Sequence, residues 1–267
     1  MGDCTGKSCD FEREYALAGE PALLDLERTF RGTAYGGTSW TTLRQAEEAA
    51  AALRLNAGRT LLEIGAGAGW PALLIAQLSG CSAVLTDPAP TGLRLARERA
   101  ARDGLADRCL LAVADGAALP FADCSFDAVH HADVLCCMAG KQQLLRECRR
   151  VARPGATMAF SVIWLARTPA GPAERELLEQ SGPPHPDAGG DYSELLDAAG
   201  WTVHSRSDVT AELLRCVEVL LRESAARRAE LVQVLGAVEF EERTKRRRST
   251  RDAIERGLLR RDWFVVG

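Results

Sequence analysis

The sequence contains no long apolar run and no surplus of positive charge. No stretch approaches the roughly 18 consecutive apolar residues of a membrane span, and the N-terminus MGDCTGKSCDFERE lacks the apolar core of a secretion signal. The net charge of −4 and the pI near 5.7 give no general attraction to nucleic acid or to an anionic membrane. We therefore expect a cytoplasmic protein that acts on a small molecule, with no nucleic acid and no membrane as partner.

Cysteine pairs at the spacing of a zinc site are also scarce. The nine cysteines are an odd number and are scattered, and a cytosolic chain keeps its thiols reduced. Cys4 and Cys9 form one pair without a second pair to complete a zinc site, so we expect no metal. The remaining exception is the adjacent pair of Cys136 and Cys137.

Length and patterning predict one α/β domain with helical additions. A chain of 267 residues fits one domain with a sizeable core. Strands alternate with helices at short spacing, which predicts a doubly wound, seven-stranded, mostly parallel, Rossmann-like sheet. The predicted strands are residues 60–65, 82–87, 109–115, 126–131, 157–164, 201–209 and 262–266. We expect an N-terminal helical cap over residues 1–55, a domain over residues 56–267, and a helical lid inserted at about 210–259.

A glycine turn follows the first predicted strand in LLEIGAGAGW, residues 61–70. Dinucleotide-binding turns read G-x-G-x-x-G, but Trp70 occupies the position of the third glycine. Glu63 places a carboxylate before the turn, where it would repel a pyrophosphate. This arrangement favours a nucleoside cofactor that carries an ammonium and a sulfonium group.

Two further acids follow in the expected order. Asp87 lies 20 residues beyond Gly67 at the end of an apolar strand, where a carboxylate can accept both hydroxyls of a ribose. Asp115 and Gly116 end the third predicted strand, in a position suited to an adenine amino group. The sequence thus has an acid, a glycine triplet and a second acid, in the order strand, helix, strand. This ordered set indicates a nucleoside-binding site more strongly than any one of its members.

These residues, together with LPFADCSFDAVHHADVL (119–135) and RECRRVARPGATMAFSVIW (146–164), resemble the class I S-adenosylmethionine-dependent methyltransferases. Within that family the chain is most similar to the small-molecule group that includes the quinone-biosynthesis enzymes. The resemblance covers residues 35–164 well and implies S-adenosylmethionine as cofactor, with metal-independent, in-line transfer of its methyl group to O or N of a metabolite. The cofactor-binding residues that it implies are Tyr35, Glu63, Gly65, Ala66, Gly67, Asp87, Pro88, Asp115, Gly116, His131 and Ala132.

The candidate catalytic residues follow the fourth predicted strand. His130 and His131 point to opposite sides of the sheet, so at most one faces the ligand crevice. The resemblance favours His131 as the one near the methionine end of the cofactor, and an equal alternative is that either imidazole is packed in the core. Asp133 could orient a histidine, bind a substrate amine or cap a helix.

Candidate substrate contacts come mainly from the segments 35–40 and 164–191, which diverge most among relatives. They are Trp40, Cys136, Trp164 and His185. Tyr35 and Trp40 either cover the cofactor or pack as staples on the next helix. Relatives commonly carry histidine where this chain has Cys137, which leaves any inherited general base in doubt.

Four alternatives remain open at this point. Adjacent Cys136 and Cys137 could bind a soft metalloid, as in the arsenite methyltransferases. The chain could instead be a regulatory protein that binds S-adenosylmethionine without turnover. The apolar face of the long helical segment packs on the core or forms a homodimer contact, and the basic cluster at residues 243–248 favours a solvated helix face over an RNA-binding patch.

Overall fold

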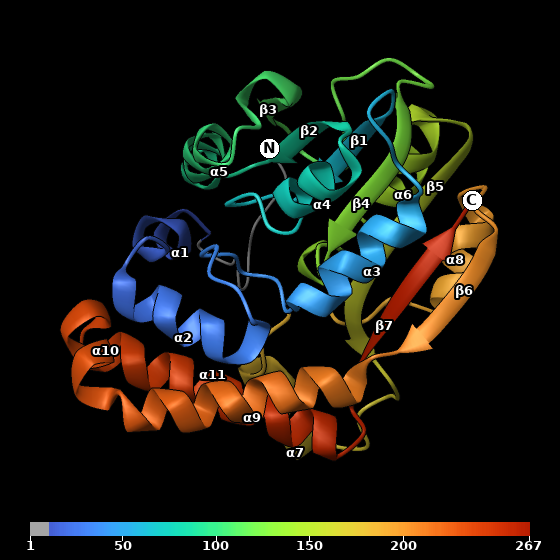
Figure 1. Cartoon of the computed structure of the whole chain (residues 1–267). Coiled ribbons are helices and arrows are strands. Elements are labelled where there is room, and N and C mark those ends of the chain that lie inside the picture. The colour runs from blue at the N-terminus through green and yellow to red at the C-terminus, as the bar shows by residue number, and fades with distance from the viewer. Residues whose placement is uncertain (1–10) are drawn as a thin grey trace.

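The computed structural model describes residues 11–267, which form a seven-stranded sheet in the order β3-β2-β1-β4-β5-β7-β6 (Figure 1). The strands are β1 (Thr60–Ile64), β2 (Ser82–Asp87), β3 (Cys109–Val113), β4 (Phe126–Ala132), β5 (Ala152–Leu165), β6 (Val203–Asp208) and β7 (Leu259–Val266). β1 to β5 pair in parallel, whereas β7 runs antiparallel to both β5 and β6. The predicted doubly wound, mostly parallel sheet is confirmed.

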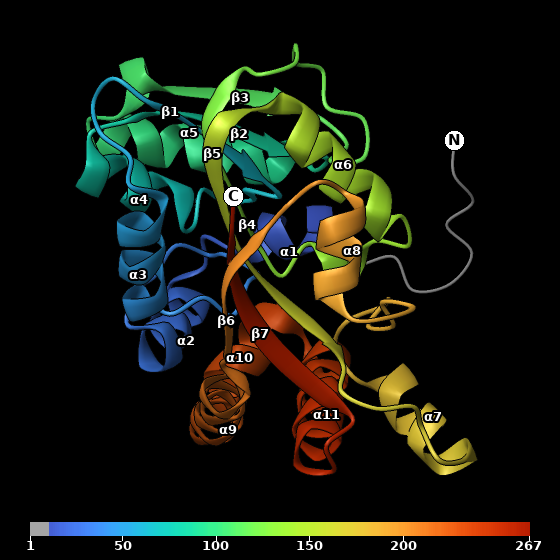
Figure 2. The ribbon, with the colours of Figure 1, turned by 90° about the vertical axis from the view of Figure 1, so that its right-hand side faces the viewer.

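Helices cover both faces of this sheet. α3 (Leu43–Leu53), α4 (Ala72–Ser79) and α5 (Pro90–Arg102) cover one face, and α6 (Lys141–Val151) and α8 (Tyr192–Ala198) cover the other (Figure 2). Short 3-10 helices, η1 (Ala106–Arg108) and η2 (Leu135–Cys137), precede β3 and follow β4. Side chains alternate along each strand, so Leu61 packs in the core under α4 whereas Phe160 packs in the core under α6 and α8. The two cores fix the carboxyl edge of the sheet, where the glycine turn lies.

A layer of helices lies beyond that carboxyl edge (Figure 1). It contains α1 (Phe11–Leu17), α2 (Pro21–Arg31), α7 (Pro172–Gln180), α9 (Thr210–Ala226), α10 (Arg228–Leu235) and α11 (Ala237–Glu255). The N-terminal and C-terminal helices share one core, in which Phe30 of α2 packs with Cys216 and Leu220 of α9. Within residues 11–267, no helix has the length and apolar character needed to cross a membrane.

Several predicted boundaries were wrong. β3 ends at Val113, so Asp115 lies in the following loop. β5 begins at Ala152 and includes the predicted turn at residues 153–155, because an irregularity in its register with β4 accommodates these extra residues. The long helical segment is three helices, since Gly236 with φ +80° separates α10 from α11.

Local capping signals predicted other boundaries correctly. Thr42 accepts a hydrogen bond from the backbone N–H of Gln45, and the Gln45 side chain accepts one from the Thr42 N–H. This capping box begins α3 as expected. Asp191 accepts a hydrogen bond from the Ser193 N–H and begins α8 in the same way.

Candidate functional site

The glycine turn joins β1 to α4 and leaves no room for side chains. Gly65 and Gly67 have φ values of +68° and +50°, a region that residues with a Cβ rarely adopt. A Cβ on Gly65 would lie 2.5 Å from Val134 Cγ2, and a Cβ on Gly67 would lie 2.1 Å from Tyr15 Oη. Neighbouring groups therefore approach the backbone of this turn directly.

Asp87 at the end of β2 holds this turn in place. One carboxylate oxygen accepts from the Gly67 N–H at 2.8 Å and the other accepts from the Ala89 N–H at 2.8 Å. Burial raises the pKa of Asp87 above its ordinary value, although the hydrogen bond from Ala89 opposes this. Asp87 therefore fixes the shape of the turn. An acid at this position also accepts ribose hydroxyls in dinucleotide-binding folds, so Asp87 does not by itself exclude a pyrophosphate.

Glu63 itself points away from the turn. Its carboxylate is fully buried, and Oε2 lies 2.8 Å from Nδ1 of His130 in β4. The His130 ring packs near Trp263 of β7, with 5.9 Å between the ring centroids. The pair lies beneath the helices on one sheet face, so this geometry supports neither a cofactor contact by Glu63 nor catalysis by His130.

His131 lies on the opposite sheet face, as strand alternation predicts. It is fully buried and stacks on Phe160 of β5 with 4.6 Å between ring centroids. Burial, together with the neighbouring His130, lowers the pKa of His131 to about 3. Neither ring nitrogen has a hydrogen-bond partner in the described part of the chain. In this position His131 is a neutral core residue and does not support the predicted role as general base or cofactor contact.

Asp133 follows β4 and is bound by Arg261 of β7. Arg261 Nε donates to one carboxylate oxygen at 2.8 Å and Nη2 donates to the other at 3.0 Å. The hydroxyl of Ser161 and the backbone N–H of Trp40 also donate to Asp133. Arg261 is fully buried and also donates to Gln45 of α3. Asp133 therefore joins three segments of the fold, and in this geometry it neither orients a histidine nor caps a helix.

The two aromatic residues predicted to cover the cofactor pack elsewhere. The Tyr35 hydroxyl donates to Asp103 at the far end of α5, and its ring lies 5.1 Å from Trp70. Trp40 packs on Phe30 of α2 at 5.9 Å. Both side chains are packed, but their contacts are with Trp70, Asp103 and α2 rather than with the next helix, α3, on which staples were expected.

Tyr15 of α1 instead covers the glycine turn, and sequence reasoning missed it. The side chain is buried, its ring packs on Gly92, and its hydroxyl lies against Gly67, 3.3 Å from Thr38 Oγ1. Burial raises the pKa of Tyr15, and the nearby Asp87 raises it further. No motif marks this tyrosine, because its contact with the turn depends on how α1 docks on α5.

The other predicted cofactor residues lie around the same edge. Ala66 donates its N–H to Thr86, Pro88 is exposed beside Asp87, and Ala132 pairs with Ser161. Asp115 is exposed and accepts from the Ala117 N–H. A Cβ on Gly116 would lie 2.9 Å from Ile64 Cγ2 and 2.9 Å from Leu144 Cδ1, so packing alone requires this glycine.

The candidate substrate residues fall into two groups. Cys136 donates its thiol to Asp133 O, and its carbonyl accepts from the His185 N–H, so the loop with His185 lies against η2. Trp164 donates to Asp262 at 3.1 Å and packs edge-on against Tyr192. The structure therefore brings Cys136 and His185 together near the end of β4, whereas Trp164 is held in a separate cluster.

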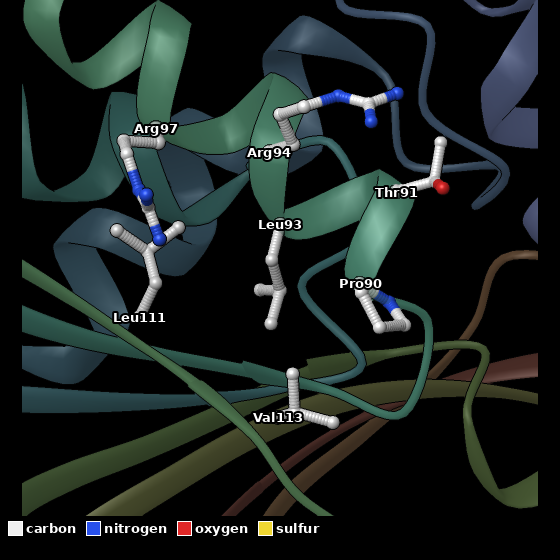
Figure 3. A pocket seen from close by; sticks show the side chains of 7 residues that line it. All are labelled: Pro90, Thr91, Leu93, Arg94, Arg97, Leu111 and Val113. Atoms are coloured by element: carbon white, nitrogen blue, oxygen red, sulfur yellow. The ribbon is translucent and has the colours of Figure 1, made fainter.

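A hollow of about 330 Å³ adjoins the ends of β2 and β3 (Figure 3). Leu93 of α5 and Leu111 and Val113 of β3 line it together with Pro90, Thr91, Arg94 and Arg97. Val113 pairs with Asp87 in the sheet. The hollow thus lies next to the cofactor candidates but includes neither Asp87 nor the glycine turn.

The fold and this edge define the class of protein. The strand order with one antiparallel strand, the glycine turn and the acid at the end of β2 together define a class I methyltransferase fold. Residues 62–160 match the family model described as a methyltransferase domain. Residues 62–160 therefore belong to a methyltransferase domain with this fold, as the sequence resemblance predicted. The cofactor fits the residues present, because each Asp87 oxygen accepts one backbone hydrogen bond and keeps a further lone pair for a ribose hydroxyl.

Several known proteins are similar to this chain. Methyltransferase GfsG of Streptomyces halstedii is 34% identical over 45% of this chain and 43% of its own length. The 27-O-demethylrifamycin SV methyltransferase of Amycolatopsis mediterranei is 32% identical over 53% of this chain and 52% of its own length. The matches thus span about half of these relatives. Further relatives include ubiquinone/menaquinone biosynthesis C-methyltransferases, the group named by the resemblance.

The fold extends over nearly the whole chain. The crystal structure of the [4+2]-cyclase SpnF superposes with a TM-score of 0.75 and 20% identity, covering 99% of this chain and 97% of the other. At this identity the similarity shows the fold alone. A shared fold does not fix the reaction, so the reaction depends on the residues of the site.

Proposed function

We propose that this protein transfers the methyl group of S-adenosylmethionine to an oxygen of a small-molecule metabolite. The observation that carries the proposal is the contact of Asp87 with the glycine turn, where the carboxylate bridges Gly67 and Ala89 at 2.8 Å each. Curated relatives include both O- and C-methyltransferases. Three similar curated proteins that match more than half of this chain are named for action on oxygen, at 53%, 63% and 57% of it, and one is named as a C-methyltransferase, at 60%. This majority favours oxygen over carbon.

When bound, S-adenosylmethionine supplies a methyl group that is already activated for displacement. The chain then has to bind the cofactor and the acceptor, orient them toward each other and exclude water from the site. Asp87 and the turn at Gly67 would hold the nucleoside, and Tyr15 would cover it from α1. Asp133 and Arg261 would keep the loop after β4 in place, since both side chains are buried and bonded to each other.

The experiment is calorimetric titration of S-adenosylmethionine into the wild type and an Asp87→Asn variant. Asparagine keeps the size of the side chain but cannot accept hydrogen bonds at both ends. Hydrogen bonds to a charged group contribute about 1.5–3 kcal/mol, so we expect affinity to fall at least tenfold. Glu63→Gln is the matched control, because Glu63 contacts His130 rather than the turn. Equal loss in both variants would refute the role of Asp87.

A second candidate is a protein that binds S-adenosylmethionine without turnover. It is favoured by the burial of His130 and His131, which leaves neither histidine in contact with the crevice. Incubation with S-adenosylmethionine and a broad metabolite mixture separates the two candidates. Formation of S-adenosylhomocysteine supports transfer, and its absence despite calorimetric binding supports the second candidate.

The arsenite alternative has less support. Cys136 is buried and its thiol donates to the Asp133 carbonyl. Among residues 11–267 no group of three histidine, cysteine or acidic side chains is arranged to hold a metal ion. Cys4 and Cys9 lie outside the described residues.

A further inference from the structure

α11 presents a stripe of inward-facing side chains that includes one charged residue. The stripe consists of Phe240, Thr244, Arg247, Thr250 and Ile254, which recur at helical spacing. All except Arg247 are buried and uncharged, and Arg247 is partly buried. An arginine enclosed in such a stripe is expected to have an anionic partner.

Among residues 11–267 no carboxylate lies within ion-pair distance of Arg247. Its Nη1 donates to the hydroxyl of Ser224 in α9 at 3.0 Å, and that serine is 1% exposed. Arg243, one turn earlier, is neutralised by Glu14 at 2.9 Å and Glu239 at 2.7 Å. Burial, together with the positive charge of Arg243, lowers the pKa of Arg247 to about 10, and the negative charge of Glu14 opposes this shift. Among the described residues the guanidinium therefore has no ion pair of its own, and Glu14 acts on it from beyond ion-pair distance.

The neighbours of Arg247 place it beside the cofactor edge. Glu14 of α1, which acts on Arg247 electrostatically, precedes Tyr15, which covers the glycine turn. Thr250, one turn after Arg247, accepts a hydrogen bond from the Gly182 N–H. Gly182 begins the loop that carries His185 against η2. Arg247 thus lies on the helix that connects the cover of the cofactor turn with the loop beyond β4.

We propose that Arg247 binds a carboxylate of the methyl acceptor, so that the preferred acceptor is a monoanionic carboxylic acid. This inference rests on the proposed function and names its substrate class. The planar guanidinium matches the two oxygens of a carboxylate, and the Ser224 hydroxyl beside it can donate to one of them. A single guanidinium without an ion pair of its own matches one negative charge better than a phosphate dianion.

Trifluoroacetate is the probe for this site, observed by 19F NMR with and without S-adenosylhomocysteine. We expect saturable binding to the wild type in the millimolar range, which is typical of one small ionic contact. Arg247→Gln should weaken this binding at least tenfold. The matched control is Arg248→Gln, which removes the same charge from the next residue, an exposed arginine in a groove between α9 and α11. Binding that is absent in the wild type, or equally weakened in both variants, would overturn the proposal.

Two further measurements distinguish carboxylate binding from a structural role of Arg247 and from a phosphate site. Since Arg247 has no ion pair to lose, Arg247→Gln should unfold at the wild-type temperature or above it, and a lower temperature would mean a structural role. Inorganic phosphate that binds tenfold more tightly than trifluoroacetate, in an Arg247-dependent manner, would overturn the choice of a carboxylate. If S-adenosylhomocysteine does not bind the wild type, the proposed function is refuted. The comparison of the two arginine variants then still decides whether Arg247 binds an anion.

Discussion

Replacing Arg261 with methionine should destabilise the protein strongly, because it leaves Asp133 buried without its counterion. Arg261 donates to both oxygens of Asp133, to Ser161 at 2.9 Å, to Gln45 at 3.0 Å and to Thr41 at 3.3 Å. Removing one partner of a buried ion pair costs about 3–5 kcal/mol. For a chain of this size each kcal/mol lowers the unfolding temperature by about 2–4 °C, so we expect a decrease of roughly 6–20 °C.

The assay is urea unfolding followed by tryptophan fluorescence for Arg261→Met, Asp133→Asn and the double variant. Because the two side chains contact each other, the double variant should be less destabilised than the sum of the single changes, by about 0.5–3 kcal/mol. Additive effects would refute the pairing. A catalytic role for Asp133 would instead abolish methyl transfer in Asp133→Asn while leaving the free energy of unfolding unchanged.

Three further outcomes are expected. Gly116→Ala should lower the free energy of unfolding by about 1–3 kcal/mol, because the new Cβ would lie 2.9 Å from both Ile64 and Leu144. Gly140→Ala is the control, since nothing lies near its Cβ, and it should change the free energy of unfolding by less than about 0.5 kcal/mol. The pKa of His131 is lowered from 6.5 to about 3, so protonation of His131 favours the unfolded state. Stability is therefore lost as pH falls below 6.5, by up to about 1.4 kcal/mol per pH unit. Thermal unfolding of His131→Phe should show a shallower loss of stability between pH 6.5 and 4.5 than the wild type, and an unchanged slope would contradict this. Tyr15→Ala should speed both association and dissociation of S-adenosylhomocysteine in stopped-flow measurements, because Tyr15 covers Gly67, and unchanged rates would show that α1 does not limit entry.

Local sequence signals predicted those parts of the fold that depend on neighbouring residues. The capping box at Thr42 and Gln45 acts within one helical turn, and the structure contains it. The glycine turn and Asp87 were recognisable because strand, turn, helix and strand follow each other without interruption. Their hydrogen bond joins residues that consecutive elements bring together.

Contacts between distant segments could not be predicted in this way. Glu63 was expected to face the cofactor, but alternation along β1 places it on the same face as Leu61, where His130 of another strand meets it. The partner of Asp133 is Arg261, 128 positions later. No local sequence pattern predicts that Asp133 and Arg261 pair, because their contact depends on the position of β7 between β5 and β6.

The position of α9, α10 and α11 in the chain has an evolutionary consequence. Asp208 at the end of β6 pairs with Asp262 of β7 in adjacent antiparallel strands, so the excursion through three helices departs from and returns to neighbouring points of the sheet. Its length and composition can vary among descendants without shifting the alignment of any strand. New acceptors could then be acquired by remodelling this excursion alone, while the cofactor edge is inherited intact.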